Sequence, residues 1–251
     1  MLTQQRKQHI LDILKKEGRV IAKTLAQALD LSEDTIRRDL RELAKEGLLQ
    51  RVHGGALPAS SAVADFATRQ GIATDGKLAI ARAAANMVQP GQIVLLDGGT
   101  TTVQLARTLP KTLAATVVTH SPSVAVELVS HPHVEVILIG GKLFKHSVVT
   151  VGTAALEALS RIRADTYFMG VTGVHPEAGL STGDLEEAHM KKALSRHAAE
   201  TVVLASHEKL GVASAYVVMP VTEMNGLVVE RNTAETLLEP YKKLGVVITR
   251  A

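Results

Sequence analysis

The sequence predicts an α/β protein in which a small winged helix-turn-helix precedes a larger, Rossmann-like, mostly parallel α/β domain. Residues 1–57 contain three helical patterns followed by a short basic hairpin, and from residue 75 onward short apolar runs alternate with helical stretches. Continuous apolar strands between helices are typical of a parallel sheet covered on both faces. We expect residues 1–57 to form the first domain, residues 58–74 a linker, and residues 75–251 the second domain.

The first two helices are predicted from apolar spacing and from the residues that end them. Thr3–Glu17 is amphipathic, with Ile10 and Leu14 on its apolar side, and Gly18 closes it. Ile21–Leu29 gives a second, shorter helix, which a tight turn separates from the third. Two helices, a turn and a third helix form the framework of a helix-turn-helix.

The third helix is predicted to begin after Ser32, a favourable N-cap residue, and to end near Gly47. Ile36, Leu40 and Leu43 recur at helical spacing and form one apolar stripe. The opposite side is basic, and Gly54-Gly55 then turns a short extended segment back on itself. A charged outer face is often only solvated, but beside a wing it suits the major groove of DNA. The candidate DNA-binding residues are Ser32, Thr35, Arg37, Arg38, Arg41, Lys45, Arg51 and His53.

The charge distribution supports DNA as the partner of this region. The chain has 28 Lys and Arg against 25 Asp and Glu, a net charge of +3. Residues 1–57 hold 11 basic and 8 acidic side chains, so all of the net charge lies there. This charge is modest, and one copy should bind duplex DNA weakly at physiological salt. We therefore expect a homodimer or homotetramer on a two-part operator.

The stretch TIRRDLRELAKEGLLQRVHGGA resembles the N-terminal module of the DeoR-type bacterial transcriptional regulators, whose signature runs through TIRRDL and ends in HGGA. The resemblance implies a repressor with a C-terminal sensor domain that binds a phosphorylated sugar or related metabolite and resembles ribose-5-phosphate isomerases. It also implies that Phe66 and Arg69, in the linker, dock it on the sensor domain.

The second domain is predicted as alternating helices and strands. A helix over residues 75–88 opens it and ends before Pro90-Gly91. The predicted strands cover residues 92–97, 116–119, 134–139, 166–169, 201–205, 227–229 and 246–249. The helices between them cover residues 100–109, 123–130, 153–161, 184–199 and 233–243. Ligands of such sheets bind beyond the carboxyl ends of the strands.

One loop at that edge has the composition of an anion site. Asp97 ends the first strand, and Gly98, Gly99, Thr100, Thr101 and Thr102 lead into a helix. Glycines let the backbone approach an anion, and the free N–H groups of a helix start donate to it. The loop is neither a Walker loop nor GxGxxG, so we expect no nucleotide cofactor. Such turns are common in α/β folds, but DGGTTT resembles the phosphate-binding turn of the DeoR-type sensor domain.

Further candidate ligand-binding residues follow other strands, and most are assigned by the same resemblance. They are His120, Gly140, Gly141, Lys142, Glu187, Lys191 and Lys209. Glu187 and Lys191 are spaced i, i+4, so they also fit a simple surface ion pair. His120 stands where the family has Asn, and Ser206 where it has an acid, so the ligand is expected to differ from the commonest ones. Residues 171–192, interrupted by glycines, are the candidate lid.

Composition excludes several other classes. The 251 residues contain no cysteine, which rules out disulfides and thiolate chemistry, and aromatic residues make up only 2%. No apolar signal region or bilayer-spanning run is found, so we expect a cytoplasmic protein without membrane contact. His131 and His133 lack a third ligand nearby, so we expect a surface loop and no metal.

Two functions remain, a ligand-responsive repressor and a sugar-phosphate isomerase-like enzyme. Isomerisation needs a carboxylate base and a stabiliser for the enediolate. Asp97, Glu187, Lys191 and Lys209 are residues of the right types. An enzyme has no need of a winged helix, however, and Ser206 stands where an acid would help. We therefore expect a repressor with no catalytic residues.

Overall fold

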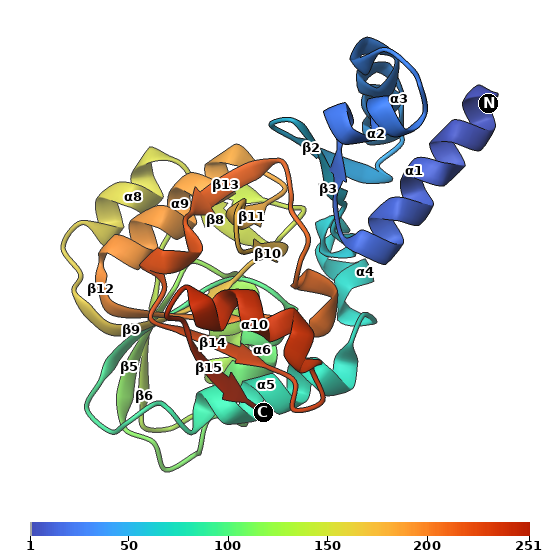
Figure 1. Cartoon of the computed structure of the whole chain (residues 1–251). Coiled ribbons are helices and arrows are strands. Elements are labelled where there is room, and N and C mark those ends of the chain that lie inside the picture. The colour runs from blue at the N-terminus through green and yellow to red at the C-terminus, as the bar shows by residue number, and fades with distance from the viewer. Residues whose placement is uncertain (1) are drawn as a thin grey trace.

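The seven apolar runs predicted from the sequence form the seven strands of one parallel sheet. A computed structural model describes residues 2–251, and its two parts are seen in Figure 1. The sheet has the order β15-β14-β12-β9-β4-β5-β6, and all its neighbours run parallel. Its strands are β4 (Ile93–Leu96), β5 (Ala115–Thr119), β6 (Val134–Leu138), β9 (Ala164–Gly170), β12 (Ala198–Leu204), β14 (Gly226–Val229) and β15 (Val247–Arg250).

Helices cover both faces of this sheet because side chains alternate along each strand. Val94 and Leu96 belong to the core on one face, whereas Leu95 belongs to the core on the other. The first core includes residues of α5 (Thr74–Ala85), α6 (Thr100–Thr108) and α7 (Pro122–Leu128). The second includes residues of α8 (Thr153–Leu159), α9 (Leu185–Arg196) and α10 (Glu235–Lys243). Both faces are buried, which confirms the predicted fold class.

Short strands outside the large sheet were not predicted, and two of them lie within the candidate lid. β7 (Lys142–Phe144) and β8 (Val149–Val151) form a hairpin. β10 (Gly173–His175) and β11 (Gly179–Thr182) pair with each other, and β11 also pairs with β13 (Tyr216–Met219). All of β11 is buried. Most of the predicted lid therefore belongs to a packed sheet and to α9.

The first domain is the predicted winged helix. Its helices are α1 (Thr3–Glu17), α2 (Ala22–Ala28) and α3 (Glu33–Lys45), and its strands β1 (Val20–Ile21), β2 (Leu49–Val52) and β3 (Gly55–Pro58) form a sheet in the order β1-β3-β2. Ile10, Ile36 and Leu40 lie in its core. A buried ion pair between Arg6 and Asp39 joins α1 to α3, a contact that the helical pattern does not reveal.

The segment between the two domains lies against the second domain along its length. We call residues 58–74 the connector; it contains the 3-10 helix η1 (Ser61–Val63) and the helix α4 (Phe66–Gln70). The Ser60 hydroxyl donates to the Thr172 carbonyl, and the Phe66 amide donates to the His146 carbonyl at 2.9 Å. Ala59 also forms a β-bridge with Ala213.

Across residues 2–251 there is no helix with the length and hydropathy needed to cross a bilayer.

Candidate functional site

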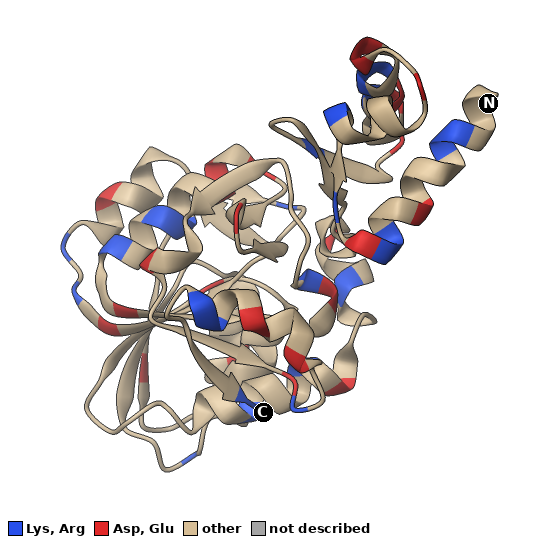
Figure 2. Cartoon of the chain, viewed as in Figure 1, with Lys and Arg blue, Asp and Glu red and all other residues tan. Residues whose placement is uncertain are grey.

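Helix α3 presents its basic side chains to solvent, as the helical spacing predicts. Ser32 caps the helix, its hydroxyl accepting from the Thr35 amide at 3.2 Å. Arg37, Arg38 and Arg41 are exposed, whereas the apolar stripe of the same helix is buried. Figure 2 shows acidic and basic residues together at this end of the molecule, and the acidic ones include the first turn of α3.

Four of the predicted DNA-binding cations line one shallow hollow on the first domain. Arg38, Arg41 and Lys45 come from α3, and Arg51 comes from β2. Arg37 differs from them, because its guanidinium is held by Glu33 at 2.7 Å. His53 is exposed in the turn between β2 and β3. Arg51 of the wing thus adds a cation to the basic surface of α3.

The second candidate site is a cleft at the carboxyl ends of β4, β9 and β12. The chain runs from β4 outward to β6 and then returns to β9 on the other side of β4, so the strand order reverses between β4 and β9. Ligands of open α/β sheets bind at such switch points. The cleft contains about 450 Å³ of space, its mouth included. Its lining residues are Ala62, Arg69, Ile72, Lys77, Gly98, Gly99, Thr100, Thr101, Thr102, Gly170, Val171, Thr172, Thr182, Glu187, Lys191, Glu208 and Lys209.

The turn after β4 admits no side chain at its two glycines. Gly99 has φ of 139°, a conformation that disfavours other residues. A Cβ on Gly98 would lie 2.0 Å from Cγ1 of the buried Val149. The backbone therefore borders the cleft directly, at the start of α6, where the first N–H groups of a helix have no partner within the helix.

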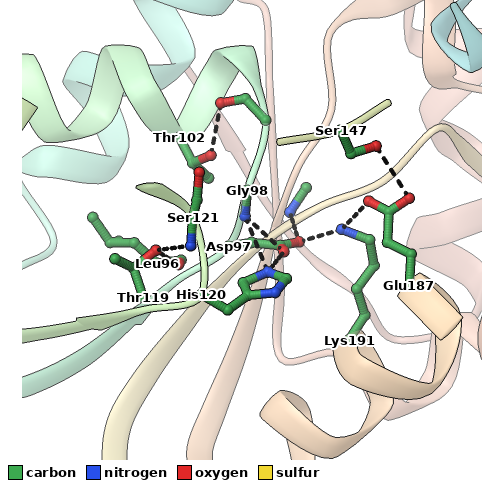
Figure 3. A network of polar contacts seen from close by, with 12 residues as sticks. Leu96, Asp97, Gly98, Thr102, Thr119, His120, Ser121, Ser147, Glu187 and Lys191 are labelled. Carbon is green, nitrogen blue, oxygen red and sulfur yellow. Dashed lines mark hydrogen bonds and ion pairs between the residues drawn. The ribbon is translucent and has the colours of Figure 1, made fainter. Parts of the chain in front are cut away.

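Asp97 lies beneath this turn and organises the floor of the cleft (Figure 3). It is fully buried, and its Oδ2 lies 2.6 Å from Lys191 Nζ and accepts from the Gly170 amide at 2.8 Å. His120 Nε2 lies 2.8 Å from Asp97 Oδ1. Burial opposes ionisation, but Lys191 and His120 together hold the pKa of Asp97 well below its ordinary value.

Glu187 and Lys191 form a buried pair, not a surface bridge. They are only 4% and 2% exposed, and Lys191 Nζ lies 3.3 Å from Glu187 Oε1. Although burial penalises the ammonium, Asp97 and Glu187 raise the pKa of Lys191. Glu187 Oε2 also accepts from the hydroxyls of Thr182 at 2.9 Å and Ser147 at 3.4 Å. Both members of the pair line the cleft.

With two further lysines, the lining of the cleft holds four cationic side chains against two carboxylates. Lys209 is 7% exposed, and burial lowers its pKa to about 8. Its ammonium has no hydrogen bond or ion pair within residues 2–251. Lys77 is 3% exposed and donates to the Arg69 carbonyl at 2.6 Å. Lys77 was not predicted from the sequence. The available signal was its position on the apolar side of α5, three residues before Ile80 and four before Ala81.

Several predicted ligand-binding residues lie outside the lining of the cleft. Asp97 and His120 lie behind it, and the His120 Nδ1 faces the Thr150 carbonyl at 2.9 Å. Gly140, Gly141 and Lys142 lead into the β7–β8 hairpin and are absent from the lining. Ser206 is buried, and its hydroxyl donates to Glu208 Oε1 at 2.7 Å. Glu208 thus brings a carboxylate to the loop that has Ser206 in place of an acid.

Of the two neighbouring histidines outside the cleft, His131 has a structural role. His131, predicted in a surface loop, is 3% exposed, and its Nε2 lies 3.1 Å from the Leu109 carbonyl. His133 is exposed, as predicted. No group of three or more residues suited to metal binding occurs within residues 2–251.

A winged helix joined to an α/β domain with a cationic cleft defines a class of protein, the DNA-binding regulators that respond to a small molecule. Two family models agree with this class: "DeoR-like helix-turn-helix domain" matches residues 6–62, and "DeoR C terminal sensor domain" matches residues 72–231. The chain belongs to the DeoR family of transcriptional regulators.

Individual relatives are consistent with that membership. The chain is 37% identical over 213 residues to the HTH-type transcriptional regulator GlpR of Haloferax volcanii, covering 84% of this chain and 83% of the relative. It is 32% identical over 208 residues to the glycerol-3-phosphate regulon repressor of Escherichia coli, covering 82% of each chain. A solved ribose 5-phosphate isomerase from Methanocaldococcus jannaschii is similar with a TM-score of 0.41 and 20% identity, covering 54% of each chain. Because the family and the named relatives are regulators, this protein is a transcriptional regulator and not an enzyme.

Proposed function

We propose that the protein represses an operon of carbohydrate metabolism and that a phosphorylated sugar or related metabolite, bound in the cleft, changes its affinity for operator DNA. One observation carries this proposal. Within residues 2–251, five buried side-chain atoms lack a hydrogen-bond partner, and three of them belong to residues that line the cleft. These three are Arg69 Nε, Thr101 Oγ1 and Glu208 Oε2. Buried polar groups without partners cost free energy, so a ligand that completes their bonds is stabilised there.

The polar atoms also indicate the chemistry of the ligand. Lys191, Lys209 and the start of α6 offer positive charge and N–H donors to an anion such as phosphate. Glu208 Oε2 is an acceptor and suits a sugar hydroxyl. A phosphorylated polyol combines both groups in one molecule. The name of the glycerol-3-phosphate regulon repressor, a relative, agrees with this class of ligand.

The binding of such a ligand should weaken as the pH rises from 7 to 9. Lys209, with a pKa of about 8, loses its positive charge over this range, whereas a phosphate monoester is already a dianion. Glycerol 3-phosphate and fructose 6-phosphate are suitable probes, with affinity measured by calorimetry. We expect the Kd to rise by up to about tenfold per pH unit above the pKa of Lys209.

The control for this experiment is Lys209→Gln. This variant should bind the phosphate more weakly at pH 7 and show a nearly flat profile up to pH 9. If the Kd of both proteins depended equally on pH, Lys209 would not contact the anion. If neither probe nor other sugar phosphates bound the protein or altered its retention on DNA, the proposed effector class would be wrong.

We propose that DNA binds at the hollow lined by Arg38, Arg41, Lys45 and Arg51. A recognition helix lies in the major groove while a wing reaches the neighbouring backbone, and this surface offers both elements. Ser32 and Thr35 lie at the start of α3. The N-terminal residues of a recognition helix are the ones that contact base edges. Arg37 and His53 would add further contacts to DNA. Arg37 would first have to release Glu33 and bind a phosphate in its place.

We also propose that the protein acts as a homodimer or homotetramer joined at the β6 edge of the large sheet. No strand of the described chain covers this edge. Leu138 of β6 is 48% exposed, and Val126 and Val129, at α7 beside it, are 68% and 83% exposed. Apolar groups at an open strand edge favour pairing with another chain. A second copy would also supply the second recognition helix.

Leu138→Lys is expected to lower the mass of the particle in sedimentation velocity, because it places a charge in the proposed interface. Leu244→Lys is the matched control: Leu244 is 41% exposed and follows α10, away from β6. The control should sediment as the wild type does. A wild-type protein that is monomeric at all concentrations, or an unchanged mass of the Leu138 variant, would contradict this interface.

A further inference from the structure

The connector forms one wall of the cleft, so the ligand would contact the segment that carries the DNA-binding domain. Ala62 of η1 and Arg69 of α4 line the cleft together with residues of the sensor domain. A second cavity lies beside it, with about 490 Å³ of space, its mouth included, and its lining includes Ala62, Val63 and Arg69 of the connector and Ser147 and Glu187 of the sensor domain. Arg69 lies between these two spaces.

A continuous chain of polar contacts joins the floor of the cleft to Arg69. It runs from Asp97 to Lys191 at 2.6 Å and from Lys191 to Glu187 at 3.3 Å, as Figure 3 shows. Ser147 then donates to Glu187 at 3.4 Å and accepts from Arg69 Nη2 at 3.2 Å. An anion that attracts Lys191 and repels Glu187 would weaken their ion pair and so alter the surroundings of the connector.

Arg69 is incompletely bonded in this arrangement. Its Nη2 has Ser147, whereas its Nε is buried without a partner within residues 2–251. Its carbonyl accepts from Lys77, which lines the cleft, whereas its side chain is bonded to Ser147, which lines the second cavity. An anion in the cleft offers an acceptor to Nε, and a guanidinium binds oxyanions through several donors at once.

We propose that Arg69 senses the bound anion and that the connector, once fixed by this contact, transmits ligand binding to the DNA-binding domain. This inference rests on the proposed function, because it requires an anionic effector in the cleft. It places the coupling within one chain, in a segment that the ligand itself contacts. A change of packing between subunits is then not needed for the response.

The test separates ligand affinity from coupling by measuring DNA binding at saturating ligand. The full-length protein and a duplex from the region upstream of its own gene are used, with glycerol 3-phosphate and fructose 6-phosphate as probes. In the wild type, saturating probe should change the Kd for DNA by about 5- to 150-fold. In Arg69→Gln this ratio should fall to within about twofold of one, even after the probe concentration is raised to restore saturation.

Thr101→Val is the control, since it removes one cleft hydroxyl without touching the connector's hydrogen bonds. It should weaken probe binding and keep the wild-type ratio at saturation. A second readout is hydrogen exchange of the amides of residues 60–70, which the probe should slow in the wild type and leave unchanged in Arg69→Gln. If Arg69→Gln is poorly folded, Ser147→Ala tests the same link and should reduce the ratio.

The outcomes distinguish the two proposals. A wild-type ratio retained by Arg69→Gln and by Ser147→Ala would overturn the role of the connector while leaving the effector site intact. A wild-type protein that binds DNA but no sugar phosphate would overturn the proposed effector, and the present inference with it.

Discussion

Replacing Arg38 by alanine is expected to weaken binding to operator DNA by about 5- to 150-fold per binding unit, the effect of losing about 1–3 kcal/mol from one base contact. Arg38 is exposed on α3, lies in the cationic hollow and has no ion-pair partner within the described residues, so its guanidinium is available to DNA. Fluorescence anisotropy with a labelled duplex at several salt concentrations measures the loss. A phosphate contact would also lower the salt slope by about one.

The fold should not depend on Arg38, because its side chain is in solvent. The melting temperature of Arg38→Ala should therefore stay close to that of the wild type, and a large decrease would mean that Arg38 is structural. Arg82→Ala is the matched control, since it removes an exposed arginine from α5 of the sensor domain. If both variants bound DNA equally well, α3 would not be the recognition helix.

Replacing Asp97 by alanine is expected to destabilise the sensor domain by about 3–5 kcal/mol. Asp97 is fully buried and compensates Lys191, and it also accepts hydrogen bonds from the Gly98 and Gly170 amides. Its removal would leave the buried Lys191 ammonium with Glu187 as its one carboxylate partner and would leave the Gly170 amide without its acceptor. A loss of this size corresponds to a decrease of about 10 °C in melting temperature.

Calorimetry of Asp97→Ala against Glu239→Ala measures this effect. Glu239 makes only an exposed i, i+4 pair with Lys243, at 3.7 Å, and its loss should cost less than about 0.5 kcal/mol. A melting temperature of Asp97→Ala within about 2 °C of the wild type would contradict the structural role of the network.

The contribution of the Asp97 charge should also depend on pH. Its pKa is lower in the folded protein than the ordinary value of 3.8, so the charge stabilises the fold above that value. The advantage of the wild type over Asp97→Asn should therefore be complete at pH 5–7 and shrink as the pH falls below about 4. A constant difference between the two proteins down to pH 3 would mean that the carboxylate is not the stabilising form.

Much of the fold is predictable from the sequence because its strongest signals are local. Each of the seven strands of the large sheet contains a short apolar run, and β4 and β14 are apolar throughout, as parallel strands need when helices cover both faces. The end of α9 is different. The pattern extends this helix to Ala199, but it ends at Arg196 because Ala198 pairs with Ala164 of β9. Pairing with a distant strand overrides the helix propensity of alanine there.

Apart from Glu187, Lys191 and Lys209, most of which the family resemblance assigned, the candidate site was predictable only within a single loop. The Gly98–Thr102 turn has a recognisable composition, whereas the short strands β10 and β11, which fill the predicted lid, are too brief for an alternating pattern. His120 follows a strand at the right edge, yet it faces Asp97 and not the cleft. The side-chain directions of His120 and of Arg69 depend on long-range packing, which no local pattern encodes.

The position of the connector has a consequence for engineering. Regulators of this architecture invite the construction of hybrid sensors, in which the DNA specificity of one protein is fused to the effector specificity of another. A fusion joined after residue 71 would import a foreign Arg69 and a foreign η1, and so would exchange part of the wall that surrounds the effector. A junction near Pro58 keeps that wall with its own sensor, and it is the natural crossover point for such hybrids.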